Sequence, residues 1–154
     1  YFDAIDSWYR EHIHEKWTEM RNSLNEVLGK EGELQEVVQL VGPDSLQDED
    51  RLVLDVSRMI RDGFLQQNAM SEIDATCSLK KQAGMLELLL SYYTHARTAL
   101  SKGVYLDDIF ALDEREDLLG LREVPEQEFA GRRDELAGKL ETSFEKLAKE
   151  GREQ

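Results

Sequence analysis

Apolar residues recur every three or four positions along most of this chain, and only two prolines interrupt them. That spacing is the period of one face of an α-helix. Such stripes run through residues 3–28, 34–41, 52–65 and 85–100, and a last one follows Pro125. No stretch alternates apolar and polar residues long enough to predict a strand. The sequence therefore predicts an all-α fold, a helical bundle of four to five main helices with short additional helices.

Glycine and proline mark the expected ends of these helices. Gly29 and Gly32 predict a loosening of the chain after the first stripe. The second stripe should stop at Pro43, because proline has no backbone N–H to continue a helix. Gly103 should end the helix that contains residues 85–100. Residues 106–112 could form a short helix before the last one begins.

The helix expected after Ser45 has an apolar face and a charged face. Ser45 stands where an N-cap would, and the acids after it fit a first helical turn. Its buried face is predicted to carry Leu52, Val53, Val56, Met59, Ile60, Phe64 and Leu65. The other side, expected to face solvent, carries Arg51, Asp55, Arg58, Arg61 and Asp62.

Charge and composition exclude several classes of partner. The chain has 154 residues with 19 Lys and Arg against 33 Asp and Glu, a net charge of −14. Nucleic acids need clustered cations, and anionic lipid also repels such a chain. No apolar run approaches the ~20 residues of a membrane span, so we expect no direct membrane insertion. The lone Cys77 has no cysteine to pair with and is expected to be a buried small residue.

No motif for catalysis or metal binding is found. A phosphate-binding P-loop would need two glycines separated by four residues and followed by Lys and a hydroxyl residue, and the chain lacks this run. His12, His14 and Glu15 could be taken as metal ligands, the basis of an alternative interpretation as a metal-dependent enzyme. Residues two apart on a helix point to different sides, however, so we predict no metal site and no catalytic residue. Phe64 and Met70 suit a core, and either could instead contact a flat ligand ring.

Four acids lie within seven residues after the Gly-Pro turn. They are Asp44, Asp48, Glu49 and Asp50. They could serve only as helix-capping and solubilising charges. They could also form an exposed acidic tip that meets a basic partner, because the turn would project them from the bundle.

A long segment, residues 40–70 with the sequence LVGPDSLQDEDRLVLDVSRMIRDGFLQQNAM, closely resembles the catalytic A subunit of archaeal-type and vacuolar-type rotary ATPases. The segment 33–40, Lys81-Gln82 and Gly103-Val104 are also similar to that protein. The resemblance covers most of the chain and weakens after about Arg122. It corresponds to the C-terminal helical domain of the A subunit, so residues 1–154 are expected to form that single domain.

The resemblance implies a hexameric head of alternating A and B subunits around a central-stalk rotor, on the cytoplasmic face of a membrane. ATP synthesis or hydrolysis there is coupled to proton or sodium transport. ATP or ADP with Mg would bind a nucleotide-binding domain that precedes Tyr1 in the parent polypeptide, and the start at Tyr1 rather than Met also suggests a fragment. This chain alone would hold no cofactor and would not hydrolyse ATP.

Two sets of site residues follow from the resemblance. The segment Pro43–Asp50 is similar to the acidic DELSEED lever of the related F-type beta subunit, which implies rotor contact by Leu46, Gln47, Asp48, Glu49 and Asp50. The segment 64–70 is similar to a family segment that ends in an aromatic residue against adenine, which implies a nucleotide pocket that includes Phe64, Gln67 and Met70.

A helix from Gln47 to Asn68 would join these two sites as a rigid arm of roughly 33 Å. The alternative is a free-standing acidic helical adaptor that binds a basic protein through the tip.

Overall fold

The regular structure is entirely helical in the part of the chain that the computed structural model describes, residues 7–8, 10–11, 14–62 and 79–153. The elements are α2 (Trp17–Val41), η1 (Pro43–Ser45), α3 (Asp48–Ile60), α5 (Leu79–Ser101), α6 (Leu106–Phe110), α7 (Glu114–Gly120), η3 (Leu121–Glu123) and α8 (Glu126–Glu153). Four of these helices are long, and the others are short. The predicted all-α bundle is confirmed.

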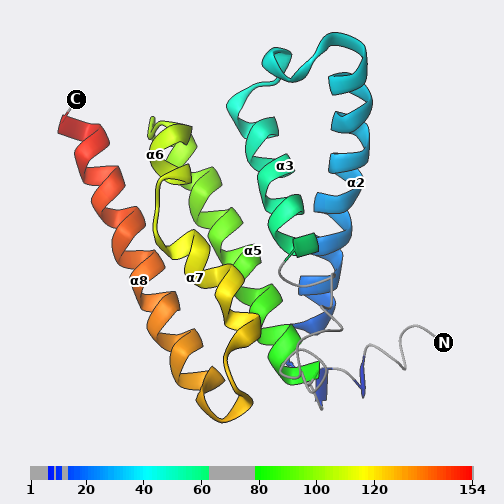
Figure 1. Cartoon of the computed structure of the whole chain (residues 1–154), viewed down its shortest axis with the longest axis vertical. Helices are drawn as coiled ribbons and strands as arrows, with labels where there is room; N and C mark the ends of the chain where they lie inside the picture. Colours follow the sequence, from blue (N-terminus) through cyan, green and yellow to red (C-terminus); the bar gives the residue numbers. More distant parts are fainter. Residues whose placement is uncertain (1–6, 9, 12–13, 63–78, 154) are drawn as a thin grey trace.

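Helix α5 is the centre of the bundle. It packs against α8 on one side and against α2 and α3 on the other, as Figure 1 shows. Helices α2 and α3 form a hairpin connected by η1, which lies at one end of the molecule. Helix α7 packs against both α5 and α8. The α2–α3 hairpin is therefore held on one side only, and its connection projects from the bundle.

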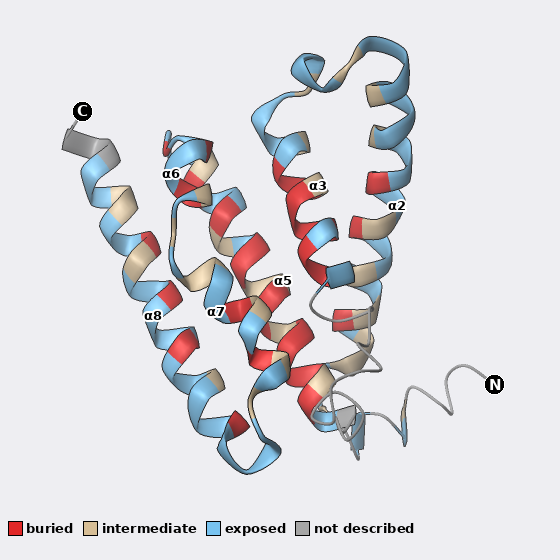
Figure 2. Ribbon diagram, viewed as in Figure 1, coloured by how far each residue is buried: buried red, intermediate tan, exposed pale blue. Residues whose placement is uncertain are grey.

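One large apolar cluster unites most of these helices. Its fully buried members include Leu52 and Ile60 of α3, Leu89 and Tyr92 of α5, and Leu118 of α7. Figure 2 shows the buried residues on the sides of α3, α5 and α8 that face one another. The predicted stripe of the last helix is confirmed, with Phe129, Leu136, Leu140 and Phe144 buried in the core and Leu147 packed against it.

Two predicted helix ends are confirmed by the backbone. Gly42 has φ +88° directly after α2, and Gly103 has φ +91° after α5. Glycine adopts this left-handed conformation without the steric cost that a side chain would bring. Val104 closes the second end, where its N–H donates to the carbonyl oxygen of Ala99 at 3.0 Å.

The first stripe differs from the prediction at both of its ends. The expected single helix is interrupted at residues 14–16, where the Lys16 N–H donates to Nδ1 of His14 at 3.0 Å, and α2 begins only at Trp17. Gly29 and Gly32 do not loosen the chain, since α2 runs through both of them to Val41. A glycine inside a helix costs only about 1 kcal/mol relative to alanine, and packing of the neighbouring apolar residues offsets that cost.

The segment between α6 and α8 also differs from the prediction, because α7 and η3 were not expected. Within the described residues, no helix is both long enough and apolar enough to cross a membrane.

Candidate functional site

An acidic tip forms at the connection between α2 and α3. The predicted residues Leu46, Gln47, Asp48, Glu49 and Asp50 lie there together, and the three acids make up the first turn of α3. Gln47, Asp48 and Glu49 are exposed, while Leu46 and Asp50 are half-buried. Carboxylates in the first turn of a helix are stabilised by the unpaired N–H groups there. The tip thus displays negative charge on a well-formed helix end.

Hydrogen bonds between residues close in sequence fix the backbone of this connection. The Gly42 N–H donates to the Val38 carbonyl at 2.9 Å, and the Leu46 N–H donates to Pro43 at 3.3 Å. The prediction that Ser45 caps α3 is wrong. Its hydroxyl donates to the Gly42 carbonyl at 2.8 Å, because Ser45 lies within η1, and Gln47 precedes the first turn of α3 instead.

Cations neutralise the tip only in part. Arg51 lies 3.6 Å from Asp48, and Arg97 of α5 lies 3.8 Å from Glu49. All four side chains are close to half exposed or more, so each pair contributes at most about 1 kcal/mol. A groove of about 740 Å³ separates the tip from the end of α5, and its lining includes Gln47, Asp48, Glu49, Arg97, Thr98 and Tyr105.

A buried carboxylate lies two turns below the tip. Asp55 was expected to face solvent with the other charged residues of α3, and this expectation is wrong, because its side chain is only 5% exposed. Its Oδ1 accepts hydrogen bonds from Arg115 of α7 at 2.5 Å and from Arg58 at 2.9 Å. Burial raises the pKa of Asp55, and the two arginines oppose that rise. Arg115 of α7 and Arg58 therefore both favour the charged form of Asp55 against the effect of burial.

The hydroxyl of Tyr92 shares this environment. Tyr92 is fully buried, and burial raises the pKa of its hydroxyl, as does the nearby Asp55 carboxylate. Neither the Tyr92 hydroxyl nor Oδ2 of Asp55 has a hydrogen-bond partner among the described residues. Of the two arginines, Arg115 compensates the buried charge more strongly, because its side chain is only 17% exposed whereas that of Arg58 is 68% exposed.

A second contact between the same two segments lies seven residues further along each of them. Arg122 of η3 donates from Nη1 to the Asp62 carbonyl at 2.7 Å, and Lys81 of α5 donates to the Arg122 carbonyl at 2.7 Å. Asp55 pairs with Arg115, and Asp62 with Arg122, so both contacts join residues 60 apart. We call these four residues the α3 clamp. They hold the middle of α3 and the turn that follows it against α7 and η3.

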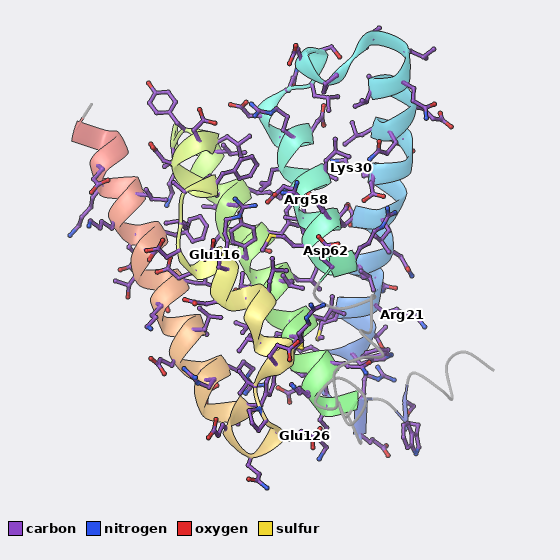
Figure 3. The ribbon with its side chains drawn as sticks, in the orientation of Figure 1. Arg21, Lys30, Arg58, Asp62, Glu116 and Glu126 are labelled. Atoms are coloured by element: carbon purple, nitrogen blue, oxygen red, sulfur yellow. The ribbon has the colours of Figure 1, made fainter. Side chains whose placement is uncertain are left out.

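Figure 3 shows Arg58 on α3 and Asp62 in the turn that follows this helix. At this end α3 is also tied to α2, because Arg61 forms an ion pair with the buried Glu31. The α-helical part of the arm ends at Ile60, and residues 61 and 62 continue it as a π-helical turn. The predicted continuation to Asn68 lies outside the described residues.

The predicted nucleotide residues Phe64, Gln67 and Met70 also lie outside the described residues, as does Cys77. His14, which was considered as a metal ligand, instead contacts Glu87 of α5 at 2.7 Å. The described part of the chain contains no group of three or more His, Cys, Asp or Glu that could hold a metal ion.

Comparison with known proteins adds the family. The sequence model described as the C-terminal domain of V and A type ATP synthase matches residues 6–110, more than half of the chain. The chain belongs to this family. The match includes the acidic tip and the whole of α3.

Curated relatives extend the similarity to nearly the full chain. It is 41% identical to the A subunit of the A-type ATP synthase of Methanopyrus kandleri over 150 residues, 97% of this chain and 25% of the relative. It is 39% identical to the corresponding A subunit of Sulfolobus acidocaldarius over 152 residues, which is 97% of this chain. It is also 39% identical to the V-type ATP synthase alpha chain of Clostridium botulinum over 151 residues, which is 98% of this chain. Each of these two matches covers 26% of the relative. The chain thus spans about a quarter of the length of these family members.

Sequence reasoning missed the α3 clamp of this family member. Both arginines of the clamp lie on segments for which no helix was predicted, and no local pattern connects residues 60 apart. The one available signal was that Asp55 and Asp62, like Arg115 and Arg122, are seven residues apart, the distance of about two helical turns.

Proposed function

We propose that the chain is the C-terminal domain of the catalytic subunit of an A/V-type ATP synthase, and that it transmits force between the nucleotide sites of the enzyme and its central-stalk rotor. Family membership and the names of the relatives support this proposal. ATP or ADP with Mg would bind in the part of the polypeptide that precedes this chain, so the chain would supply no catalytic residue. Its partners would be the B subunits and the rotor of an A3B3 head on the cytoplasmic face of the membrane, where the enzyme moves protons or sodium ions.

The observation that carries the proposal is the position of the acidic tip. Asp48, Glu49 and Asp50 occupy the end of a hairpin that is braced from behind by α5. Because neighbouring helices support this helix end, it can exert force on a bound partner with little displacement of its own. In this proposal the tip residues from Leu46 to Asp50 contact the rotor.

The other end of α3 leads toward the proposed nucleotide contact. The 13 residues of α3 span about 20 Å, and the chain continues from Asp62 to Phe64, Gln67 and Met70. In the proposal, Met70 lies against the adenine ring, where a thioether can make a polarisable apolar contact. A change in nucleotide occupancy would displace this segment and tilt α3, a conformational coupling in which no bond is made or broken.

The test of the tip uses the complete ATP synthase. We expect the triple variant D48N/E49Q/D50N to weaken binding of the central stalk to the head and to reduce the dependence of that binding on salt, because surface charges act over about 10 Å at moderate ionic strength. A charge-matched control, E141Q/E145Q/E150Q, changes three exposed acids of α8 and should leave binding unchanged. Rotor binding that is the same in both variants would refute the tip assignment.

The nucleotide side has its own experiment. Met70→Phe should raise the affinity of the complete subunit for nucleotide, since a phenyl ring offers a flat stacking surface that a thioether lacks. Equal affinity of the two proteins, measured by titration with a fluorescent ATP analogue, would count against adenine contact at residue 70.

A further inference from the structure

The end of α2 exposes a row of large apolar side chains. Leu40 is 84% exposed, Val41 65% and Val37 39%. Positions 37, 40 and 41 are spaced i, i+3 and i+4, so the three side chains lie on one face of the helix. We call these three residues the apolar seam.

The bundle does not cover this part of α2. The buried residues of α2 are Met20, Val27 and Glu31, and none lies beyond residue 31. Figure 2 shows the hairpin end of α2 almost wholly exposed. Helix ends that face only water are usually polar, and a contiguous apolar row on a surface marks a site of interaction. The seam is therefore better explained by a partner than by the fold of the chain itself.

Charges around the seam indicate what the partner is. Between residues 31 and 50 the chain has no Lys or Arg, and the exposed acids nearest to the seam in sequence are Glu33, Glu36 and Asp44. The acids of the tip follow, and cations neutralise these only in part. A second copy of this chain would bring the same acids against these, and like charges across an interface disfavour association. Anionic lipid is disfavoured for the same reason. The complementary surface is apolar at its centre and basic at its rim.

We propose that the apolar seam docks a basic amphipathic helix of a partner protein. A helix fits because a row at i, i+3 and i+4 is the surface onto which another helix packs its own ridge. The three apolar residues provide the affinity of the contact, while the surrounding acids steer the approach of the partner. This inference rests on the proposed function and adds to it, since it makes apolar residues of α2, rather than the acidic tip, the main source of binding strength.

The test uses this 154-residue chain and a designed peptide as the probe. The peptide is a helix with leucine along one face and lysine elsewhere, and its binding is measured by fluorescence anisotropy at several salt concentrations. We expect L40S/V41S to bind at least tenfold more weakly, with the salt dependence unchanged. The triple variant D48N/E49Q/D50N should lose less affinity and show a weaker salt dependence.

Three controls make the test specific. Trp8→Ser removes an exposed apolar side chain that lies outside α2 and outside the groove beside the tip, and it should leave binding unchanged. A scrambled peptide of the same composition, which has no apolar face, should not bind. Circular dichroism should show the same helix content and melting in L40S/V41S as in the unmodified chain, because neither residue belongs to the core.

Several outcomes would overturn the inference. These are equal binding of the peptide to L40S/V41S and to the unmodified chain, equal binding of a peptide with glutamate in place of lysine, or a dimer of this chain that L40S/V41S dissolves. In the complete ATP synthase, the proposed function fails if neither the seam variant nor the tip variant affects rotor binding. The seam inference fails alone if only the tip variant does.

Discussion

Asp55 is a buried carboxylate whose compensation depends on Arg115. Replacing Arg115 by methionine removes the charge and keeps a side chain that can fill the space. Asp55 then retains only Arg58, which is largely exposed. We expect the free energy of unfolding at neutral pH to fall by about 3 kcal/mol, because removal of one partner leaves a buried charge poorly compensated. Urea unfolding followed by circular dichroism measures this loss.

The pH dependence of the Arg115→Met defect has a definite sign. Burial already holds the pKa of Asp55 above its ordinary value of 3.8, and loss of Arg115 raises it further. Between the unfolded and the folded pKa, the folded chain binds more protons than the unfolded chain, so stability falls as the pH rises. The defect should be smallest below pH 3.8 and should grow as the pH rises through the folded pKa. If Arg115→Met lowered the free energy of unfolding equally below pH 3.8 and at neutral pH, the result would contradict this account.

Arg51→Met is the matched control for that experiment. Arg51 is 46% exposed and lies 3.6 Å from Asp48, so its loss should cost less than about 1 kcal/mol.

The acidic tip and Asp55 differ in how far the sequence could predict them. The acids of the tip were noticed because they lie close together after a Gly-Pro turn, and the resemblance to the rotary ATPase family implied their contact with the rotor. The burial of Asp55 was not predicted, because it depends on an arginine 60 residues away.

Helices α5 and α8 approach closely at Gly84. A Cβ atom at this position would lie 2.8 Å from Cε1 and 3.1 Å from Cζ of Phe129, whose buried ring has little room to move. We expect Gly84→Ala to destabilise the chain by about 1–2 kcal/mol, since the clash outweighs the better helix propensity of alanine. Thermal unfolding followed by circular dichroism provides the measurement.

Gly138 of α8 offers the opposite case. A Cβ there would meet no atom within 4 Å, so Gly138→Ala should stabilise the chain by about 0.5–1 kcal/mol. If both substitutions raised the melting temperature alike, the close contact of α5 with α8 would not be as described.

The helices that sequence patterns predicted well are those whose ends are set by local covalent geometry. Gly42 and Gly103 adopt a positive φ, and Pro125 directly precedes α8, so each of these ends follows from one residue and its neighbours. The helices that were missed depend on packing. Helix α7 has only seven residues, too few for its apolar spacing to stand out, and it is held by contacts with α5 and α8. Local glycine signals likewise failed at Gly29 and Gly32, where the packed neighbours decide.

The whole molecule has a core that extends beyond the segment matched by the family model. That match ends at Phe110, yet the buried cluster also includes Leu118, Leu121, Phe129 and Leu140. The similarity to the curated relatives, in contrast, covers 97% of the chain. The C-terminal helices therefore complete the core of the bundle, and α7 and η3 additionally carry the arginines of the α3 clamp.

A chain that ends at residue 110 should accordingly fail to form a cooperative fold. It would expose the side of α5 that α8 covers, including Tyr92, which lies with its ring centroid 6.0 Å from that of Phe144. We expect it to bind a hydrophobic dye such as ANS and to lose a sharp thermal transition, because secondary structure persists without fixed packing. A chain that ends at Glu150 keeps every described core residue and should melt like the full chain. Leu140→Ala leaves a cavity in the core beside α8 and should lower the free energy of unfolding by about 2–4 kcal/mol. This variant therefore tests the packing of α8 without truncation. Cooperative melting of residues 1–110 at the midpoint of the full chain would show that α3 and α5 need no C-terminal brace, and would remove the structural basis for force transmission through α3.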